Sequence, residues 1–188
     1  IYEDAIYISD NIGFIYKLDA RDGKVIWIKN HGIPIKSDIK LYEEKIYLIN
    51  QDNRLLCFDA NDGSLIWNSR SIRSFIKSQN LLSLAISSQK DLVILNSAGD
   101  LVKLKSRTGQ IYWTLSALGS LYAHDADFFR SSKIVLTDNE IIFSTENSTF
   151  CHQKCFNKKY RSIPIFVCHI LRSPPFQKCD SISRWSSV

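Results

Sequence analysis

The sequence predicts an all-β fold: a partial β-propeller of four-stranded antiparallel blades, with about three blades and part of a fourth. Three observations predict it. The 188-residue chain contains a repeat whose glycines, Gly23, Gly63 and Gly109, lie 40 and 46 residues apart. Short runs of β-branched and aromatic residues alternate with polar turns, as in strands joined by hairpins. A tryptophan follows each glycine by four residues. A period in the forties matches four short strands with their turns.

Each repeat opens with an apolar strand that begins 17 residues before its glycine, at Ile6, Ile46 or Leu92. A polar turn follows, and a second strand then runs toward the glycine. The turns lie at equivalent positions, over Asp10–Gly13, Gln51–Arg54 and Ser97–Asp100. Their equivalence indicates a common structure and does not by itself indicate binding.

A tight hairpin connects the second strand to the third. It contains Asp-Gly in the first two repeats and Thr-Gly in the third. Glycine is favoured there because a positive φ strains any residue that carries a Cβ. Asp19 and Asp59 recur just before this hairpin. We therefore expect their side chains to cap the turn and not to catalyse a reaction.

The third strand carries the tryptophans, Trp27, Trp67 and Trp113, and one more strand precedes the next repeat. A four-stranded sheet with two apolar faces cannot bury both alone, so neighbouring sheets should stack radially. Each indole can then bury roughly 200 Å² against the adjacent sheet, which is worth several kcal/mol at about 25 cal/mol per Å². The additional strands are expected near Ile39–Tyr42, Leu81–Ser87 and Lys133–Thr137.

These repeats resemble the PQQ-like, quinoprotein-type propeller repeat over about residues 4–150. The third copy departs from the family pattern at Lys105-Ser106, where Asp-Ala is usual. Within this family, the chain most resembles the BamB-type lipoproteins of the outer-membrane protein assembly machinery. The matching segments are Leu18–Gly23 with Trp27, Phe58–Gly63 with Trp67, and Thr108–Gly109 with Trp113.

The resemblance implies a non-enzymatic propeller scaffold for protein–protein interaction on the periplasmic side of the bacterial outer membrane, with peripheral membrane association of the full-length protein. It implies two kinds of partner: a subunit of the assembly machinery and unfolded β-barrel clients. No catalytic residue, metal or cofactor is then expected. The residues expected to matter are structural: Asp19, Gly23, Trp27, Asp59, Gly63, Trp67, Gly109 and Trp113.

Two alternatives stay open: a fragment of a quinone (PQQ)-dependent dehydrogenase, and a nonfunctional product of a degraded gene. The resemblance implies that the dehydrogenase needs a cofactor cavity, a calcium or lanthanide ion and a catalytic Asp, and many such enzymes carry two adjacent cysteines. The sequence has neither adjacent cysteines nor a Cys-x-x-Cys-His haem motif, which favours the scaffold. The segment His124–Asp127 offers three metal-ligand types but fits a solvated loop better. His31 is expected to be a turn residue.

The repeat does not continue to the end of the chain. A fourth copy begins with Lys133–Thr137 and Ile141–Thr145, but Lys158 and Ser162 stand where its glycine and tryptophan would fall. From residue 151 onward there are seven basic residues and one acid, a net charge of +6, which leaves −1 for the preceding residues out of a total of +5. The sequence therefore predicts propeller repeats over residues 1–150 and a non-repeat, basic tail over residues 151–188.

Three interpretations of this tail are open. A frameshift near residue 150 would explain the changes in repeat, charge and cysteine usage by one event. A disordered or loosely packed extension is the second. The third is a zinc site, although no Cys-x2-Cys pair is present. Basic and aromatic residues are scattered there without a strand or helix pattern, so no nucleic-acid partner is expected. The candidate zinc ligands are Cys151, Cys155, Cys168, His169 and Cys179.

No apolar run reaches the roughly 18 residues that a membrane-spanning helix needs. The chain opens with Ile1, contains no Met and shows no signal peptide. By the resemblance a full ring has about eight blades, so the end blades of this chain should expose apolar faces and strand edges. We expect low stability or oligomerisation of the chain alone, which a sharp, cooperative melt of a monomer would contradict.

Overall fold

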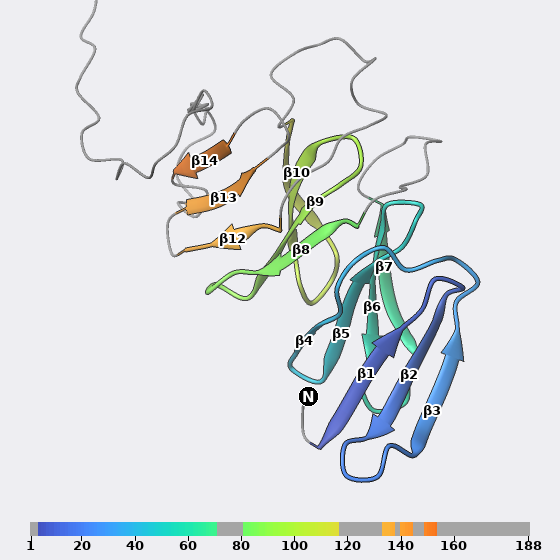
Figure 1. Cartoon of the computed structure of the whole chain (residues 1–188). Helices are drawn as coiled ribbons and strands as arrows, with labels where there is room; N and C mark the ends of the chain where they lie inside the picture. Colours follow the sequence, from blue (N-terminus) through green and yellow to red (C-terminus); the bar gives the residue numbers. More distant parts are fainter. Residues whose placement is uncertain (1–3, 71–80, 117–132, 138–139, 145–148, 154–188) are drawn as a thin grey trace, which may run out of the picture.

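The structure, a computed structural model, describes residues 4–70, 81–116, 133–137, 140–144 and 149–153. All the regular elements in these ranges are β-strands, which form four antiparallel sheets lying one beside the next (Figure 1). The all-β, partial-propeller prediction is confirmed. The strands are β1 (Ala5–Ser9), β2 (Phe14–Asp19), β3 (Val25–Asn30), β4 (Lys40–Tyr42), β5 (Lys45–Ile49), β6 (Arg54–Asp59), β7 (Leu65–Arg70), β8 (Ser83–Ile86), β9 (Asp91–Leu95), β10 (Asp100–Lys105), β11 (Ile111–Ser116), β12 (Val135–Leu136), β13 (Glu140–Ser144) and β14 (Thr149–Gln153).

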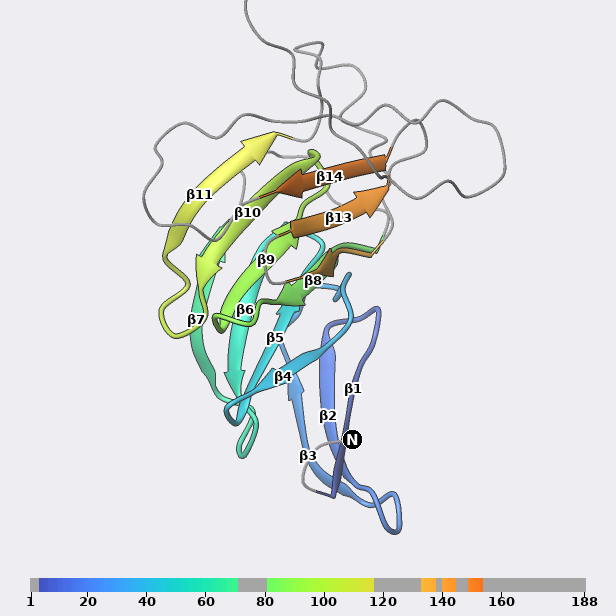
Figure 2. The same cartoon turned by 90° about the vertical axis from the view of Figure 1, so that its left-hand side faces the viewer.

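The sheets, which we call blades 1 to 4, are simple meanders (Figure 2). Blades 2 and 3 have four strands each, in the orders β4-β5-β6-β7 and β8-β9-β10-β11. Blade 1 (β1-β2-β3) lacks a counterpart of β4 among the described residues, and blade 4 (β12-β13-β14) lacks a counterpart of β7. Strand β14 extends to Gln153, three residues past the predicted division between repeats and tail.

The glycine hairpins have the backbone conformation that the sequence predicts. Gly23, Gly63 and Gly109 have φ values of 72°, 71° and 69°. The Asp19 carboxylate accepts a hydrogen bond from the backbone N–H of Arg21 at 2.8 Å, and Asp59 accepts the equivalent bond from Asn61 at 2.7 Å. Both side chains therefore stabilise the start of their turn, which is the role expected of them.

Each strand that carries a tryptophan, namely β3, β7 and β11, has a β-bulge just before that tryptophan. In β3 the register with β2 shifts between the pairs Leu18–Val25 and Lys17–Trp27, which leaves Ile26 without a partner. The same shift occurs in β7 and β11. Because side chains alternate between the two faces of a strand, one extra residue changes the face toward which the next side chain points. The unpaired residues in the other two strands are Ile66 and Tyr112.

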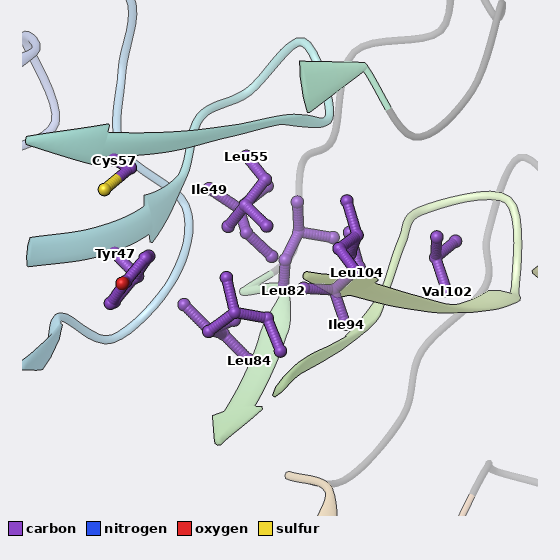
Figure 3. Close-up of a cluster of buried hydrophobic side chains, with 10 residues drawn as sticks. Tyr47, Ile49, Leu55, Cys57, Leu82, Leu84, Ile94, Val102 and Leu104 are labelled. Carbon is purple, nitrogen blue, oxygen red and sulfur yellow. The ribbon is translucent and has the colours of Figure 1, made fainter. Parts of the chain in front are cut away.

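Among the described residues the hydrophobic core forms three clusters, one at each junction between successive blades. Figure 3 shows the cluster between blades 2 and 3, where side chains of β5 and β6 meet those of β8, β9 and β10. The cluster between blades 1 and 2 is centred on Ile15, Ile46 and Phe58. The cluster between blades 3 and 4 contains Val93 and Ile141. Burial thus joins each blade only to its neighbours, as in repeat proteins.

Candidate functional site

The most regular feature of the molecule is the contact between a tryptophan of one blade and the hairpin glycine of the next. A Cβ added to Gly63 would lie 3.0 Å from Cζ3 of Trp27 and 2.8 Å from Cγ of Lys29. A Cβ added to Gly109 would lie 2.5 Å from Cε3 of Trp67. Real Cβ atoms essentially never lie within 3.0 Å of another atom and rarely lie as close as 3.0 Å, so these two glycines provide space for an indole ring as well as a positive φ.

An aromatic neighbour holds each of the first two indoles. The ring centroids of Tyr7 and Trp27 are 6.2 Å apart, and those of Tyr47 and Trp67 are 6.0 Å apart, both in tilted arrangements. Blade 3 has Val93 in place of the tyrosine, and Trp113 packs there on the cluster shared with blade 4. The tilted geometry is one that aromatic pairs favour.

The two indoles differ in their hydrogen bonding. The Nε1–H of Trp67 donates to the backbone carbonyl of Ser106 at 3.1 Å. The equivalent carbonyl in blade 2, that of Ala60, instead accepts a bond from the Tyr7 hydroxyl at 3.1 Å. The buried Nε1 of Trp27 has no hydrogen-bond partner among the described residues. The first junction therefore contains a buried donor whose hydrogen bond is not made.

The strand position opposite each tryptophan is occupied by Lys17, Cys57 and Lys103 in turn. The Lys103 ammonium lies 3.0 Å from the Asp91 carboxylate, and both side chains are largely buried, at 8% and 16% exposure. Cys57 is fully buried, and burial raises the pKa of its thiol to about 12. The thiol therefore stays protonated at neutral pH and is not a nucleophile.

The repeated polar turn after the first strand of each repeat was expected from the sequence, but the side chains that accept its hydrogen bonds were not. The side-chain oxygens of Asp10, Asn50 and Asn96 each accept hydrogen bonds from the backbone N–H groups two and four residues further on, at 2.9–3.1 Å. In the turn of blade 2, the buried Asn53 exchanges two hydrogen bonds with Ser97 of blade 3, at 2.8 and 3.0 Å. The signal was present in the sequence, because the three accepting residues recur at the same 40- and 46-residue steps as the glycines.

His31 lies in the connection after β3, as expected, but it also contacts the core. Its ring centroid is 4.2 Å from that of Phe58, and its buried Nε2 has no partner among the described residues. Burial, assisted by the charge of Lys29, lowers the pKa of His31 below its ordinary value. Nothing in the sequence pattern indicated this contact, since it joins a loop to the next blade.

A cavity of about 290 Å³ lies beside the first strands of blades 2, 3 and 4. Its charged lining residues are Asp38, Lys40 and Lys133, and the Lys133 ammonium is 2.5 Å from the Asp38 carboxylate. No group of three or more His, Cys, Asp or Glu side chains able to hold a metal ion is found among the described residues. The segment His124–Asp127 and the candidate zinc ligands from Cys155 onward lie outside those residues.

No helix long and apolar enough to cross a membrane is present in the part of the chain that the structure describes. The consecutive meander sheets, stacked through a repeated tryptophan–glycine contact, define a segment of a quinoprotein-type β-propeller. The chain belongs to the family described as outer membrane protein assembly factor BamB, whose model matches residues 2–152.

Many solved structures share this fold, including the following two. BamB from Moraxella catarrhalis superimposes with a TM-score of 0.62 at 16% sequence identity, over 80% of this chain and 46% of that one. Quinohemoprotein alcohol dehydrogenase from Comamonas testosteroni gives a TM-score of 0.51 at 18% identity, over 61% of this chain and 20% of that one. The chain thus spans less than half the length of either protein. Comparison with curated protein sequences gives no significant match.

Proposed function

We propose that the chain is a non-enzymatic propeller scaffold that binds proteins during the assembly of outer-membrane β-barrels, on the periplasmic side of the bacterial outer membrane. The family match over residues 2–152 is the observation that carries this proposal. The packing agrees with it, because each junction between blades is filled by large apolar side chains. Protein partners would then bind to side chains on the surface of the blades.

The surface offers apolar contacts at two of the tryptophan-bearing strands, β7 and β11. Leu65 and Ile66 of β7 are 48% and 44% exposed, and Ile111 and Tyr112 of β11 are 39% and 52% exposed. Blades 2 and 3 each have a neighbouring blade on both sides, so this exposure does not arise from a missing neighbour. The bulge also distorts the exposed edges of these strands, which discourages hydrogen bonding with strands of other molecules. We infer that these residues contact the apolar side chains of unfolded β-barrel clients.

A binding assay tests this function. A fluorescent outer-membrane β-barrel precursor, unfolded in urea, is diluted into the purified chain, and binding is followed by anisotropy. We expect saturable binding that weakens at least several-fold when Ile66→Ser and Tyr112→Ser are combined. The control is Val135→Ser, which removes an apolar side chain that is 57% exposed from β12. Absence of binding, or equal weakening by the control, would contradict the proposal.

The dehydrogenase fold neighbour supports a second candidate, a fragment of a quinone-dependent dehydrogenase. This candidate predicts that pyrroloquinoline quinone with Ca²⁺ binds the chain and shifts the quinone absorbance. Saturable quinone binding together with no binding of the β-barrel precursor would favour the dehydrogenase over the scaffold.

A further inference from the structure

The cavity beside the first strands of blades 2, 3 and 4 takes three of its polar groups from one equivalent position. In each of these blades one residue of the first strand pairs with a fully buried residue of the next strand: Leu41, Ile86 and Leu136. The residues three positions earlier are Asp38, Ser83 and Lys133, and all of these line the cavity. Three successive blades therefore place an acid, a hydroxyl and a base around one hollow.

The charged groups lie at the exposed part of this cavity. Asp38 and Lys133 form an ion pair, and both side chains are exposed. The half-buried Lys40 also lines the cavity, and its ammonium group has no ion-pair or hydrogen-bond partner among the described residues. Two ammonium groups and one carboxylate leave one positive charge in excess.

The wall of the cavity is apolar and buried, and it contains one hydroxyl group. Leu82, Leu84 and Ile134 line it, and all of them are buried. The buried Ser83 hydroxyl accepts a hydrogen bond from the backbone N–H of Ile134 at 2.7 Å. Its own O–H has no acceptor in the part of the chain that the structure describes. A hydroxyl can donate one hydrogen bond while it accepts another, so Ser83 has a donor available to a molecule in the cavity.

These groups indicate the chemical class of a ligand. Asp38 is the only acid among the lining residues and is already paired, so the cavity does not suit a cation. The excess positive charge and the Ser83 donor suit an anionic oxygen, and the wall suits a hydrocarbon group. A single excess charge matches a carboxylate better than a doubly charged phosphate. The volume of about 290 Å³ lies at the lower end of ligand pockets, which restricts the ligand to a small molecule.

We propose that this cavity binds a small carboxylic acid with an apolar body. Its carboxylate accepts hydrogen bonds from the Lys40 ammonium and the Ser83 hydroxyl, and its hydrocarbon part contacts the buried wall. The ion pair of Asp38 with Lys133 stays intact beside it. This site does not depend on the binding of β-barrel clients, which we assign to β7 and β11.

Fluorine NMR tests the site on the intact chain, with para-fluorophenylacetate as the probe. We expect saturable broadening of the fluorine signal, with a dissociation constant in the millimolar range or tighter, as for a small ligand that makes few contacts. The matched probe is para-fluorophenylacetamide, which has nearly the same shape and no charge. It should bind at least about tenfold more weakly, because it lacks the charge-assisted hydrogen bonds. Equal binding of the two probes, or no binding of the acid, overturns the proposal.

Three variants locate the binding. Lys40→Gln should weaken binding of the acid about tenfold and leave the urea midpoint unchanged, since this ammonium has no described partner. Lys105→Gln is the matched control, because it removes an exposed lysine of β10 that does not line the cavity. Ala85→Leu adds bulk to the lining and should abolish binding of the acid in a chain whose urea midpoint shows that it is folded. Equal binding of the acid by the Lys40→Gln and Lys105→Gln variants overturns the proposal, as does unchanged binding by a folded Ala85→Leu variant.

Discussion

The indole of Trp67 occupies the space in which any residue other than glycine at position 109 would place its Cβ, 2.5 Å from Cε3. Gly109→Ala should therefore destabilise the chain more than Gly32→Ala, which has the same positive φ but an open environment. We expect a difference of about 1–3 kcal/mol, the range for overpacking a core, in urea unfolding. Equal losses would show that the glycine serves only the turn.

The hydrogen bonding of the two indoles predicts different responses to phenylalanine. Trp67→Phe removes a bond and leaves the carbonyl of Ser106 without its donor, whereas Trp27→Phe removes a buried N–H that has no described partner. Both indoles are partly buried against a core cluster. We expect Trp67→Phe to cost about 1 kcal/mol more in the free energy of unfolding. If Trp27→Phe is the more damaging, the difference in hydrogen bonding does not govern these contacts.

His31 should make the stability of the chain depend on pH. The folded state lowers its pKa, so the unfolded chain binds more protons over the range between the folded pKa and the ordinary value of about 6.5. The free energy of unfolding is therefore not reduced by His31 above pH 6.5, and it decreases as the pH is lowered from that value toward the pKa of His31 in the folded state. Urea unfolding between pH 7.5 and 5.5 measures the slope. His31→Phe keeps a ring against Phe58 and should reduce the slope; an unchanged slope would assign it to other groups.

The buried ion pair of blade 3 should be sensitive to the loss of one partner. Asp91→Asn removes the carboxylate 3.0 Å from the Lys103 ammonium, and we expect a loss of about 3 kcal/mol. Adding Lys103→Met should recover part of that loss, since the residue at the equivalent position in blade 2 is the uncharged Cys57.

Asp22→Asn is the control, because the Asp22–Lys24 pair is exposed and should contribute nothing measurable to the melting midpoint. An equal effect of the two Asp→Asn changes would show that burial does not set the strength of the blade 3 pair.

The division near residue 150 remains a prediction, and the nucleotide sequence can test it. A frameshift predicts that another reading frame downstream of codon 150 encodes a glycine followed four residues later by tryptophan, in phase with Gly109 and Trp113. If no frame restores that pattern, the frameshift interpretation is wrong.

The fold could be predicted because its main determinants are local and repeat. Gly23 and Trp27 lie in one hairpin, and the other two copies of that hairpin have the same glycine–tryptophan spacing and the same geometry. The observed strand limits differ from the predicted ones by a few residues. For example, β8 begins at Ser83, whereas the sequence predicted a strand from Leu81.

The contacts between blades were harder to foresee. The ring contact of His31 with Phe58 and the hydrogen bonds between Asn53 and Ser97 join residues 27 and 44 positions apart. Secondary-structure propensities depend on neighbouring residues in the sequence, so they do not predict contacts between residues so far apart. The tryptophan contact was an exception, because a large residue at a fixed offset in three copies needs a common neighbour, yet only the structure identifies Gly63 and Gly109 as that neighbour.

The bulges before the tryptophans have a consequence for how this chain can evolve. The side chains of Ile26, Ile66 and Tyr112 are half exposed, so the fold does not require a particular side chain there, but none of the three residues can be deleted without loss of the bulge. Loss of one residue would restore regular pairing and turn the following indole to the opposite side of its sheet. Selection for the fold should therefore act on chain length at these sites, so that homologues share the gap-free spacing of glycine and tryptophan, whereas selection on the side chain itself comes from the proposed client binding.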